Sequence, residues 1–191
     1  MLVIYAHFDR SGHNGEVLKT VEECFREREL PYQVLDLYTS GFDPVLRAQD
    51  VRTRGKSETD ATVRALQERI EAERDFVLIY PTWWTNVPAM LKGFYDRVFL
   101  VGFAFRYRPS GIPERLLRGR RALVITTTGG PAAYHRIVTL GRSIRVSTDD
   151  VLGFSGFRTR HLLIGHCRKL DETKRREIRR RVRRAVVRFV G

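Results

Sequence analysis

The stretch FVLIYPTWWTNVPAMLKGFYDRVF, residues 76–99, holds a strand, a loop and a helix in that order. Phe76 to Tyr80 is a continuous apolar run, as expected for a strand that is buried on both faces of a parallel sheet. From Val87 to Phe99, apolar residues recur with helical spacing. Because Pro81 and Pro88 bracket the connection, we expect a rigid, shaped loop between this strand and this helix.

The same alternation of buried strand and helix extends in both directions from this stretch. The predicted strands are Leu2–Ala6, Tyr32–Leu37, Phe76–Tyr80, Ala122–Thr126 and Leu162–Ile164. The predicted helices run from Val17 to about Glu29, from about Glu58 to Arg74, from Val87 to Phe99, more weakly from about Tyr134 to Val146, and from an N-cap at Asp171 to residue 190; Thr39 to Ser57 is a long polar connection. This pattern predicts an α/β fold, a doubly wound five-stranded parallel sheet with helices on both faces and right-handed crossovers. No internal repeat or linker divides the chain, so we expect residues 1–191 to form a single domain.

The net charge of +13 is concentrated in one segment. Arg168 to Gly191 carries +8 of it, and within this segment Ile178, Val182, Val186 and Phe189 recur at helical spacing. We therefore expect a basic helix over 171–190 that docks through an apolar stripe and turns its arginines to solvent. Peripheral docking of this helix on an anionic membrane surface stays open as an alternative. No aromatic residues interleave the basic run, so we expect no nucleic-acid partner.

Several classes of protein are disfavoured by the rest of the composition. The longest apolar runs are about eight residues (Val98 to Phe105), against roughly 20 for a membrane span. The N-terminus has no basic segment before its apolar run, so we expect no signal peptide and a cytoplasmic location. Cys24 and Cys167 lie far apart without metal-ligand spacing, so neither a disulfide scaffold nor a metal site is expected.

Ligands of such sheets bind outside the carboxyl ends of the strands, which directs attention to three loops. His7 to Asn14 is polar and opens a helix, so its backbone N–H groups suit a phosphate; a capped turn without a ligand is the alternative. Pro81 to Pro88 carries two adjacent tryptophans whose rings suit a planar heterocycle, unless both are core residues. Thr127 to Gly130 lets a ligand approach the backbone closely, or is a plain glycine turn. A phosphate site beside a flat aromatic site matches the two parts of a flavin.

Several motifs give this chain a resemblance to the NAD(P)H:quinone oxidoreductase family with the flavodoxin-like fold. The most specific block runs from Pro81 through Trp84, Val87-Pro88-Ala89, Leu91-Lys92-Gly93 and Asp96-Arg97-Val98-Phe99 to Gly102-Phe103-Ala104-Phe105-x-Tyr107. Ala6-His7 with Asn14, Gly41-Phe42-Asp43-Pro44, Thr127-Thr128-Gly129-Gly130 and Tyr134 complete the set. The matches cover most of the chain in the right order.

The resemblance implies a tightly bound FAD or FMN and a ping-pong relay of hydride from NAD(P)H, through flavin N5, to a quinone or similar acceptor. By position, His7, Gly12, His13 and Asn14 would surround the flavin phosphate. Pro81, Thr82, Trp83, Trp84 and Thr85 would line the isoalloxazine edge, and Thr127, Thr128, Gly129, Gly130 and Tyr134 would meet its pyrimidine end. Trp84, Phe105 and Tyr107 would wall the substrate pocket, the last two reaching across the interface of a homodimer. Tyr134 and His135 are the candidate catalytic residues.

Three positions depart from the family pattern. A histidine expected six residues after Tyr134 is Leu140, so His135 is the nearest histidine to the pocket tyrosine. A tyrosine expected at position 105 is Phe105, and an aromatic residue frequent at position 13 is His13. Two other functions remain possible from the sequence: an electron carrier similar to flavodoxin, and a regulatory subunit of a membrane transporter.

Overall fold

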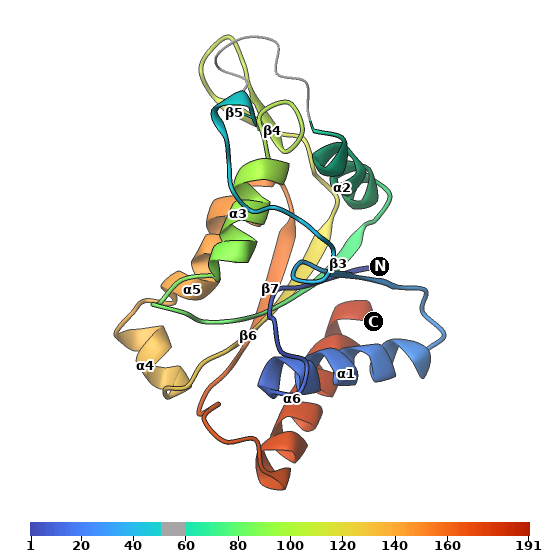
Figure 1. Ribbon diagram of the computed structural model, residues 1–191, viewed down its shortest axis with the longest axis vertical. Coiled ribbons are helices and arrows are strands. Elements are labelled where there is room, and N and C mark those ends of the chain that lie inside the picture. Colours follow the sequence, from blue (N-terminus) through green and yellow to red (C-terminus); the bar gives the residue numbers. More distant parts are fainter. Residues whose placement is uncertain (51–59) are drawn as a thin grey trace.

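The computed structural model describes residues 1–50 and 60–191, and over these ranges the chain forms a five-stranded parallel sheet in the order β2-β1-β3-β6-β7 (Figure 1). Parallel register places Val3 beside Val77, and Leu78 beside Val124. The strands are β1 (Leu2–Tyr5), β2 (Gln33–Asp36), β3 (Asp75–Pro81), β6 (Arg121–Thr127) and β7 (Arg158–Ile164). A separate two-stranded antiparallel hairpin consists of β4 (Phe105–Tyr107) and β5 (Pro113–Arg115).

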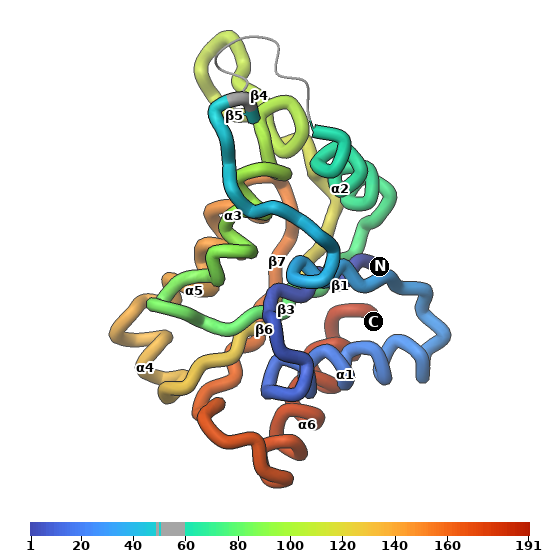
Figure 2. Tube along the Cα trace, in the orientation of Figure 1, coloured from blue at the N-terminus to red at the C-terminus, as the bar shows by residue number. Residues whose placement is uncertain are grey.

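Helices cover both faces of this sheet, which confirms the doubly wound prediction. On one face, α1 and α6 bury an apolar cluster that includes Val77 and Ile125; on the other, α2, α3 and η3 bury one that includes Leu78 and Val124. Figure 2 shows α1 and α6 side by side, as their ion pairs require. The helices are α1 (His13–Arg26), η1 (Ala48–Asp50), α2 (Ala61–Glu71), α3 (Ala89–Val98), α4 (Ala132–Ile137), α5 (Arg142–Arg145), the π-helix η3 (Val146–Gly153) and α6 (Glu172–Val190).

The five predicted strands are all present, and the differences lie in the connections. β7 begins at Arg158, four residues before the predicted start. The predicted start of the second helix near Glu58, and the end of the polar connection at Ser57, lie outside the described residues; the described part of that connection contains the short helix η1. The hairpin of β4 and β5 was not predicted.

The prediction of one weak helix from Tyr134 to Val146 is wrong. The segment forms α4, then a break, then α5, and continues as the π-helix η3 to Gly153. The break occurs because Leu140 and Gly141 both adopt left-handed backbone angles, with φ of 51° and 67°. This conformation interrupts the helical hydrogen bonds and turns α5 in a new direction.

The C-terminal helix confirms the predicted cap and stripe, but only part of its arginines turn to solvent as predicted. The Asp171 carboxylate accepts from the Lys174 N–H at 2.9 Å, and Ile178, Val182, Val186 and Phe189 are buried. Arg175 and Arg179, however, both bind the buried carboxylate of Glu16 on α1, at 2.7 and 2.6 Å. The reason is that α6 packs along α1, whose acidic residues face it. None of the helices in the described ranges has the length and apolar character needed to cross a bilayer.

Candidate functional site

The loops that follow β1, β3 and β6 meet at one edge of the sheet. The Thr82 N–H donates to the Thr127 carbonyl at 2.7 Å, which joins the second and third loops. The Thr127 hydroxyl donates to the Asn14 side-chain oxygen at 3.1 Å, which joins the third loop to the first. The His7 and Trp83 rings, with centroids 5.9 Å apart, bring the first loop into contact with the second. The structure thus brings together the three segments that the sequence singled out.

The first loop delivers the N-terminus of α1 to this edge. The first N–H groups of any α-helix have no acceptor within the helix. Here the N-cap is Gly12, which has no side chain that could accept from them. Those N–H groups, at residues 13–15, carry the positive end of the helix dipole and suit an anion. A Cβ at Gly15 would lie 1.7 Å from the Arg10 carbonyl oxygen, so only glycine lets the loop fold this closely over the helix.

Side chains of the first loop mostly hold its shape. Asp9 accepts from both the N–H and the hydroxyl of Ser11, at 2.7 Å each, and the hydroxyl bond lowers the pKa of this carboxyl. Arg10 binds Asp36 at the end of β2. Because the Ser11 N–H is already used, the donors left for a phosphate are those at the start of α1.

His13 occupies this helix start with a buried ring atom that lacks a partner. Its Nε2 makes no hydrogen bond to any described residue. Burial lowers the pKa of His13, so the ring is neutral at pH 7. A buried polar atom without a partner costs free energy, so this atom is a candidate for a contact that the protein alone does not supply.

The loop after β3 is strained and presents an apolar ring to solvent. Trp84 and Thr85 have φ of 49° and 59°, a left-handed conformation that costs such residues roughly 1–2 kcal/mol each. Trp83 and Asn86 exchange backbone hydrogen bonds at 3.0 and 2.8 Å and close the turn, while the N–H groups of Trp84 and Thr85 meet no acceptor among the described residues. Trp84 is 100% exposed and Trp83 37% exposed. The alternative that both tryptophans are core residues is therefore wrong.

Backbone hydrogen bonds join the loop after β6 to the end of β7 and the segment that follows it. The Thr128 N–H donates to Ile164, and the Cys167 and His166 N–H groups donate to Thr128 and Gly130. This fastening holds Thr128, Gly129 and Gly130 against the carboxyl end of the sheet.

The two candidate catalytic residues have different surroundings. Tyr134 is 50% exposed, whereas His135 is only 8% exposed. His135 Nε2 lies 2.7 Å from the Thr128 hydroxyl, and its Nδ1 has no partner within the described ranges. Burial lowers the pKa of His135, which makes the ring neutral at pH 7. The rings of Tyr134 and His135 contact edge to face, with centroids 5.6 Å apart.

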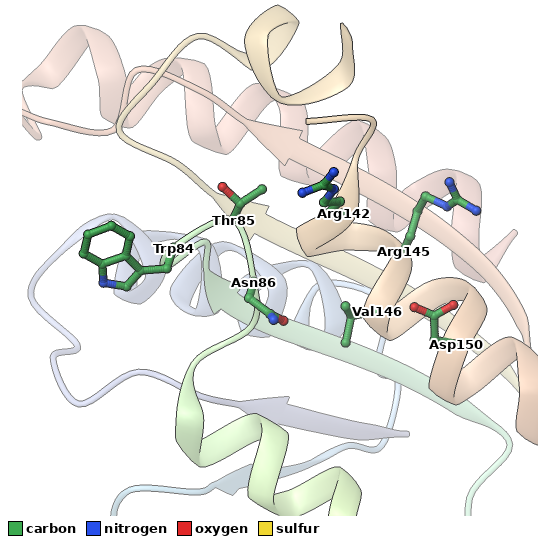
Figure 3. A pocket seen from close by; sticks show the side chains of 7 residues that line it. All are labelled: Trp84, Thr85, Asn86, Arg142, Arg145, Val146 and Asp150. Carbon is green, nitrogen blue, oxygen red and sulfur yellow. The ribbon is translucent and has the colours of Figure 1, made fainter. Parts of the chain in front are cut away.

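A cavity of about 400 Å³ adjoins the tryptophan loop (Figure 3). Thr85 and Asn86 line one side, and Arg142 and Arg145 of α5 line the other, with Trp84 pointing away from them. Arg145 pairs with Asp149 at 3.2 Å, while no described carboxylate lies within ion-pair distance of Arg142. These two arginines were not predicted as site residues, because the turn at Gly141 that brings α5 here leaves no sign in the sequence beyond the glycine itself.

Phe105 and Tyr107 lie elsewhere within one chain. They belong to β4, which follows α3, whereas Trp84 precedes α3 (Figure 1). The helix has ten residues, so it separates them by about 15 Å. Phe105 packs on Phe154 of the segment after η3, with ring centroids 4.9 Å apart, and Tyr107 is exposed. One chain alone does not bring these two residues to the tryptophan loop.

The sheet order, the helices on both faces and the three loops at one edge define a flavodoxin-like α/β protein. Residues 1–188 match the family described as having the flavodoxin-like fold, and the chain belongs to that family.

Several of the similar proteins are quinone oxidoreductases by name. The ribosyldihydronicotinamide dehydrogenase [quinone] of Mus musculus is 31% identical over 150 residues, covering 69% of this chain and 64% of the relative. The FMN-dependent NADH:quinone oxidoreductase of Bordetella avium is 35% identical over 130 residues, covering 67% and 60%. The structure of the NAD(P)H:quinone oxidoreductase from Methanothermobacter marburgensis is 26% identical with a TM-score of 0.85, covering 100% of this chain and 96% of the other. The match spans less than two thirds of the length of the first of these relatives.

Proposed function

We propose that this protein is a flavin-dependent NAD(P)H oxidoreductase that passes two electrons, as hydride, to a quinone or similar electrophilic acceptor. The observation that carries the proposal is the fully exposed Trp84 on a strained loop. An exposed indole is costly for a protein without a ligand, and together with the two N–H groups that meet no described acceptor it suits the edge of a planar, heteroatom-rich ring. The names of the similar proteins support the same activity.

The residues of the edge fit the two parts of a flavin. The N–H groups at the start of α1, together with Gly12, His13 and Asn14, would bind its phosphate, and His7 would close this end of the site. Pro81 to Thr85 would line the isoalloxazine, with the N–H groups of Trp84 and Thr85 as donors to its edge. Thr127 to Gly130 would contact the pyrimidine end. When bound, the flavin supplies the capacity to accept and pass on a hydride.

The chain's own contribution is to place fixed dipoles where negative charge develops. Backbone N–H groups held by a strained turn need no reorganisation when that charge appears, which is the condition for strong electrostatic stabilisation. Tyr134 is the candidate hydrogen-bond donor at the pyrimidine end. His135, neutral and bound to the Thr128 hydroxyl, would position the third loop and share a proton with Thr128.

The cavity beside Trp84 is the candidate entry for both substrates. Arg142 and Arg145 outnumber the one carboxylate in its lining, Asp150, and this excess of positive charge suits the phosphates of NAD(P)H. Phe105 and Tyr107 would complete it only from a second copy of the chain, so the proposal includes a homodimer in which β4 of one subunit reaches the tryptophan loop of the other. We further propose that residues 1–191 act as one domain in the cytoplasm.

The choice of cofactor is testable. FMN is the first expectation, because the Bordetella avium relative is named for it, and FAD is the alternative. The purified protein should absorb at about 450 nm, as oxidised flavins do. Mass analysis of the released cofactor distinguishes FMN from FAD. A colourless protein that takes up neither flavin would contradict the proposed function.

A further inference from the structure

A cleft between β7 and α6 lies away from the three loops, and the proposed function does not use it. Its volume is about 480 Å³, larger than the cavity beside Trp84. Leu123, Leu162 and Ala185 form an apolar floor. Arg160, Arg181, Arg184 and Arg188 surround this floor.

The arginines of this cleft differ from their neighbours on the same helix. On the side of α6 that faces α1, Arg175 and Arg179 share Glu16, and Arg183 binds Glu23 and Glu27. On the cleft side, Arg181 pairs with Glu177 at 3.0 Å, but Arg184 and Arg188 have no carboxylate within ion-pair distance among the described residues. The cleft lining itself contains no acidic residue in the described part of the chain.

Two of these arginines are held in position by the backbone. Arg160 donates to the Arg188 carbonyl at 2.7 Å, and Arg181 donates to the Leu163 carbonyl at 2.8 Å. These bonds fasten β7 to α6 on both sides of the cleft. The frame of the cleft is therefore fixed, whereas the exposed Arg184 and Arg188 have no described carboxylate partner and keep their N–H donors available for an anion.

The arginines and the apolar floor of the cleft together indicate the chemistry of a ligand. Gathered guanidinium groups without carboxylates raise the local potential, and an anion lowers that energy. The apolar floor favours a ligand that also has an apolar body, and the volume lies within the range of small-molecule sites.

We propose that this cleft binds a small organic anion, with a phosphate or carboxylate head on Arg184 and Arg188 and an apolar body on Leu162 and Ala185. Arginine suits both heads, because its planar fork donates two parallel hydrogen bonds to either. Leu123 lies four residues before Thr127 on β6, about 13 Å along the strand, so this ligand and one at the three loops bind at the same time. The inference does not depend on the proposed function.

The test is a titration of the ¹⁵N-labelled protein, as purified, followed by amide chemical shifts. The probes are phenyl phosphate, benzoate, inorganic phosphate and benzyl alcohol. We expect saturable shifts at Leu162, Arg184 and Ala185 with phenyl phosphate or benzoate, and the tighter of these two identifies the head group. Inorganic phosphate and benzyl alcohol, which carry only the charge or only the ring, should bind at least about tenfold more weakly.

A pair of variants with equal loss of charge locates the site. R184Q/R188Q should weaken the preferred probe about tenfold or more, whereas R26Q/R176Q, which removes two exposed arginines outside the cleft lining, should change it less than about twofold. R184Q alone should weaken binding of the preferred probe less than the double variant does. Because Arg184 is exposed, this single substitution preserves folding.

Three results would overturn the proposal. The first is the absence of saturable shifts in the cleft with either organic anion. The second is an equal loss in both double variants, which indicates diffuse attraction to an extended polyanion or a lipid surface. The third is inorganic phosphate binding as tightly as phenyl phosphate, which removes any role for the floor.

Discussion

The Thr127 hydroxyl donates a hydrogen bond to the side-chain oxygen of Asn14, 113 residues earlier in the chain, at a distance of 3.1 Å. Both residues are buried. The bond connects the end of β6 to the first turn of α1, and it therefore fixes the distance between the proposed phosphate and pyrimidine ends of the site.

Replacing Thr127 by valine keeps the shape of the side chain and removes this bond. The Asn14 oxygen would be left buried without a donor, so we expect the free energy of unfolding to fall by about 1–3 kcal/mol and flavin binding to weaken. Urea denaturation and flavin titration measure the two effects. The neighbouring Thr126 provides the control, because its hydroxyl is buried without a described partner. Thr126→Val should be neutral or stabilising, and a larger loss in Thr126→Val than in Thr127→Val would contradict this role.

The two tryptophans of the β3 loop should respond differently to substitution. Trp84 is fully exposed, so Trp84→Ala should leave the stability of the flavin-free protein unchanged and weaken flavin retention or turnover about tenfold. Trp83 contacts His7 and Phe8, so Trp83→Ala should lower stability more and flavin retention less. Thermal unfolding and flavin fluorescence titration separate the two effects. Equal, negligible changes in flavin binding would remove the proposed role of this loop.

Arg142 should contribute to binding of the reductant. Arg142→Gln removes a charge without a described acidic partner from the cavity beside Trp84, so KM for NAD(P)H should rise about five- to tenfold with little change in KM for the quinone. Arg26→Gln, an exposed arginine at the end of α1, is the matched control and should leave both constants unchanged. If Arg142→Gln raised both KM values equally, the arginine would not be specific to the nucleotide.

The contact between α1 and α6 should depend on pH through Glu16. Burial opposes ionisation of Glu16, but hydrogen bonds from Arg179 and Arg175 lower its pKa overall, below the ordinary 4.5. A carboxyl with a lowered pKa in the folded state stabilises the fold above its unfolded pKa, and this contribution is lost as the pH falls from about 4.5 through the folded value.

Glu16→Gln should accordingly destabilise the protein by about 1–3 kcal/mol at pH 7, with a difference that shrinks as the pH falls below about 4. Glu22→Gln on the same helix removes a carboxylate without a described ion pair and should change stability by less than about 0.5 kcal/mol. Urea unfolding at several pH values measures both. A difference between Glu16→Gln and wild type that is independent of pH would contradict the ion-pair explanation.

Elements with strong periodicity were predictable from the sequence. Strands such as Phe76–Tyr80 are continuous apolar runs because both their faces are buried, and α6 is visible because its stripe recurs every three or four residues. β7 was predicted short because it is the edge strand, and it begins with two exposed arginines and a half-buried threonine rather than an apolar run. Left-handed turns at single residues, such as Leu140, leave no periodic signal, so α4 and α5 were merged into one predicted helix, and η3 beyond Val146 was not predicted.

For the site, the sequence predicted residue types and loop positions better than side-chain directions. The three loops meet as expected, because parallel strands end at one edge. Burial of His135 against Thr128, and exposure of Trp84, depend on backbone angles that no local pattern specifies. Arg142 and Arg145 could not be placed because their helix follows an unpredicted turn. The roles of all these residues in catalysis stay predictions.

The proposed hydride relay is tested most directly by its two half-reactions, observed separately without oxygen. Addition of NAD(P)H alone should bleach the flavin absorbance at about 450 nm. After removal of the nucleotide, a quinone alone should restore this absorbance in one two-electron step. In the steady state, double-reciprocal plots should then be parallel. Reduction that requires the quinone to be present, or intersecting plots, would contradict a shared cavity that serves donor and acceptor in turn.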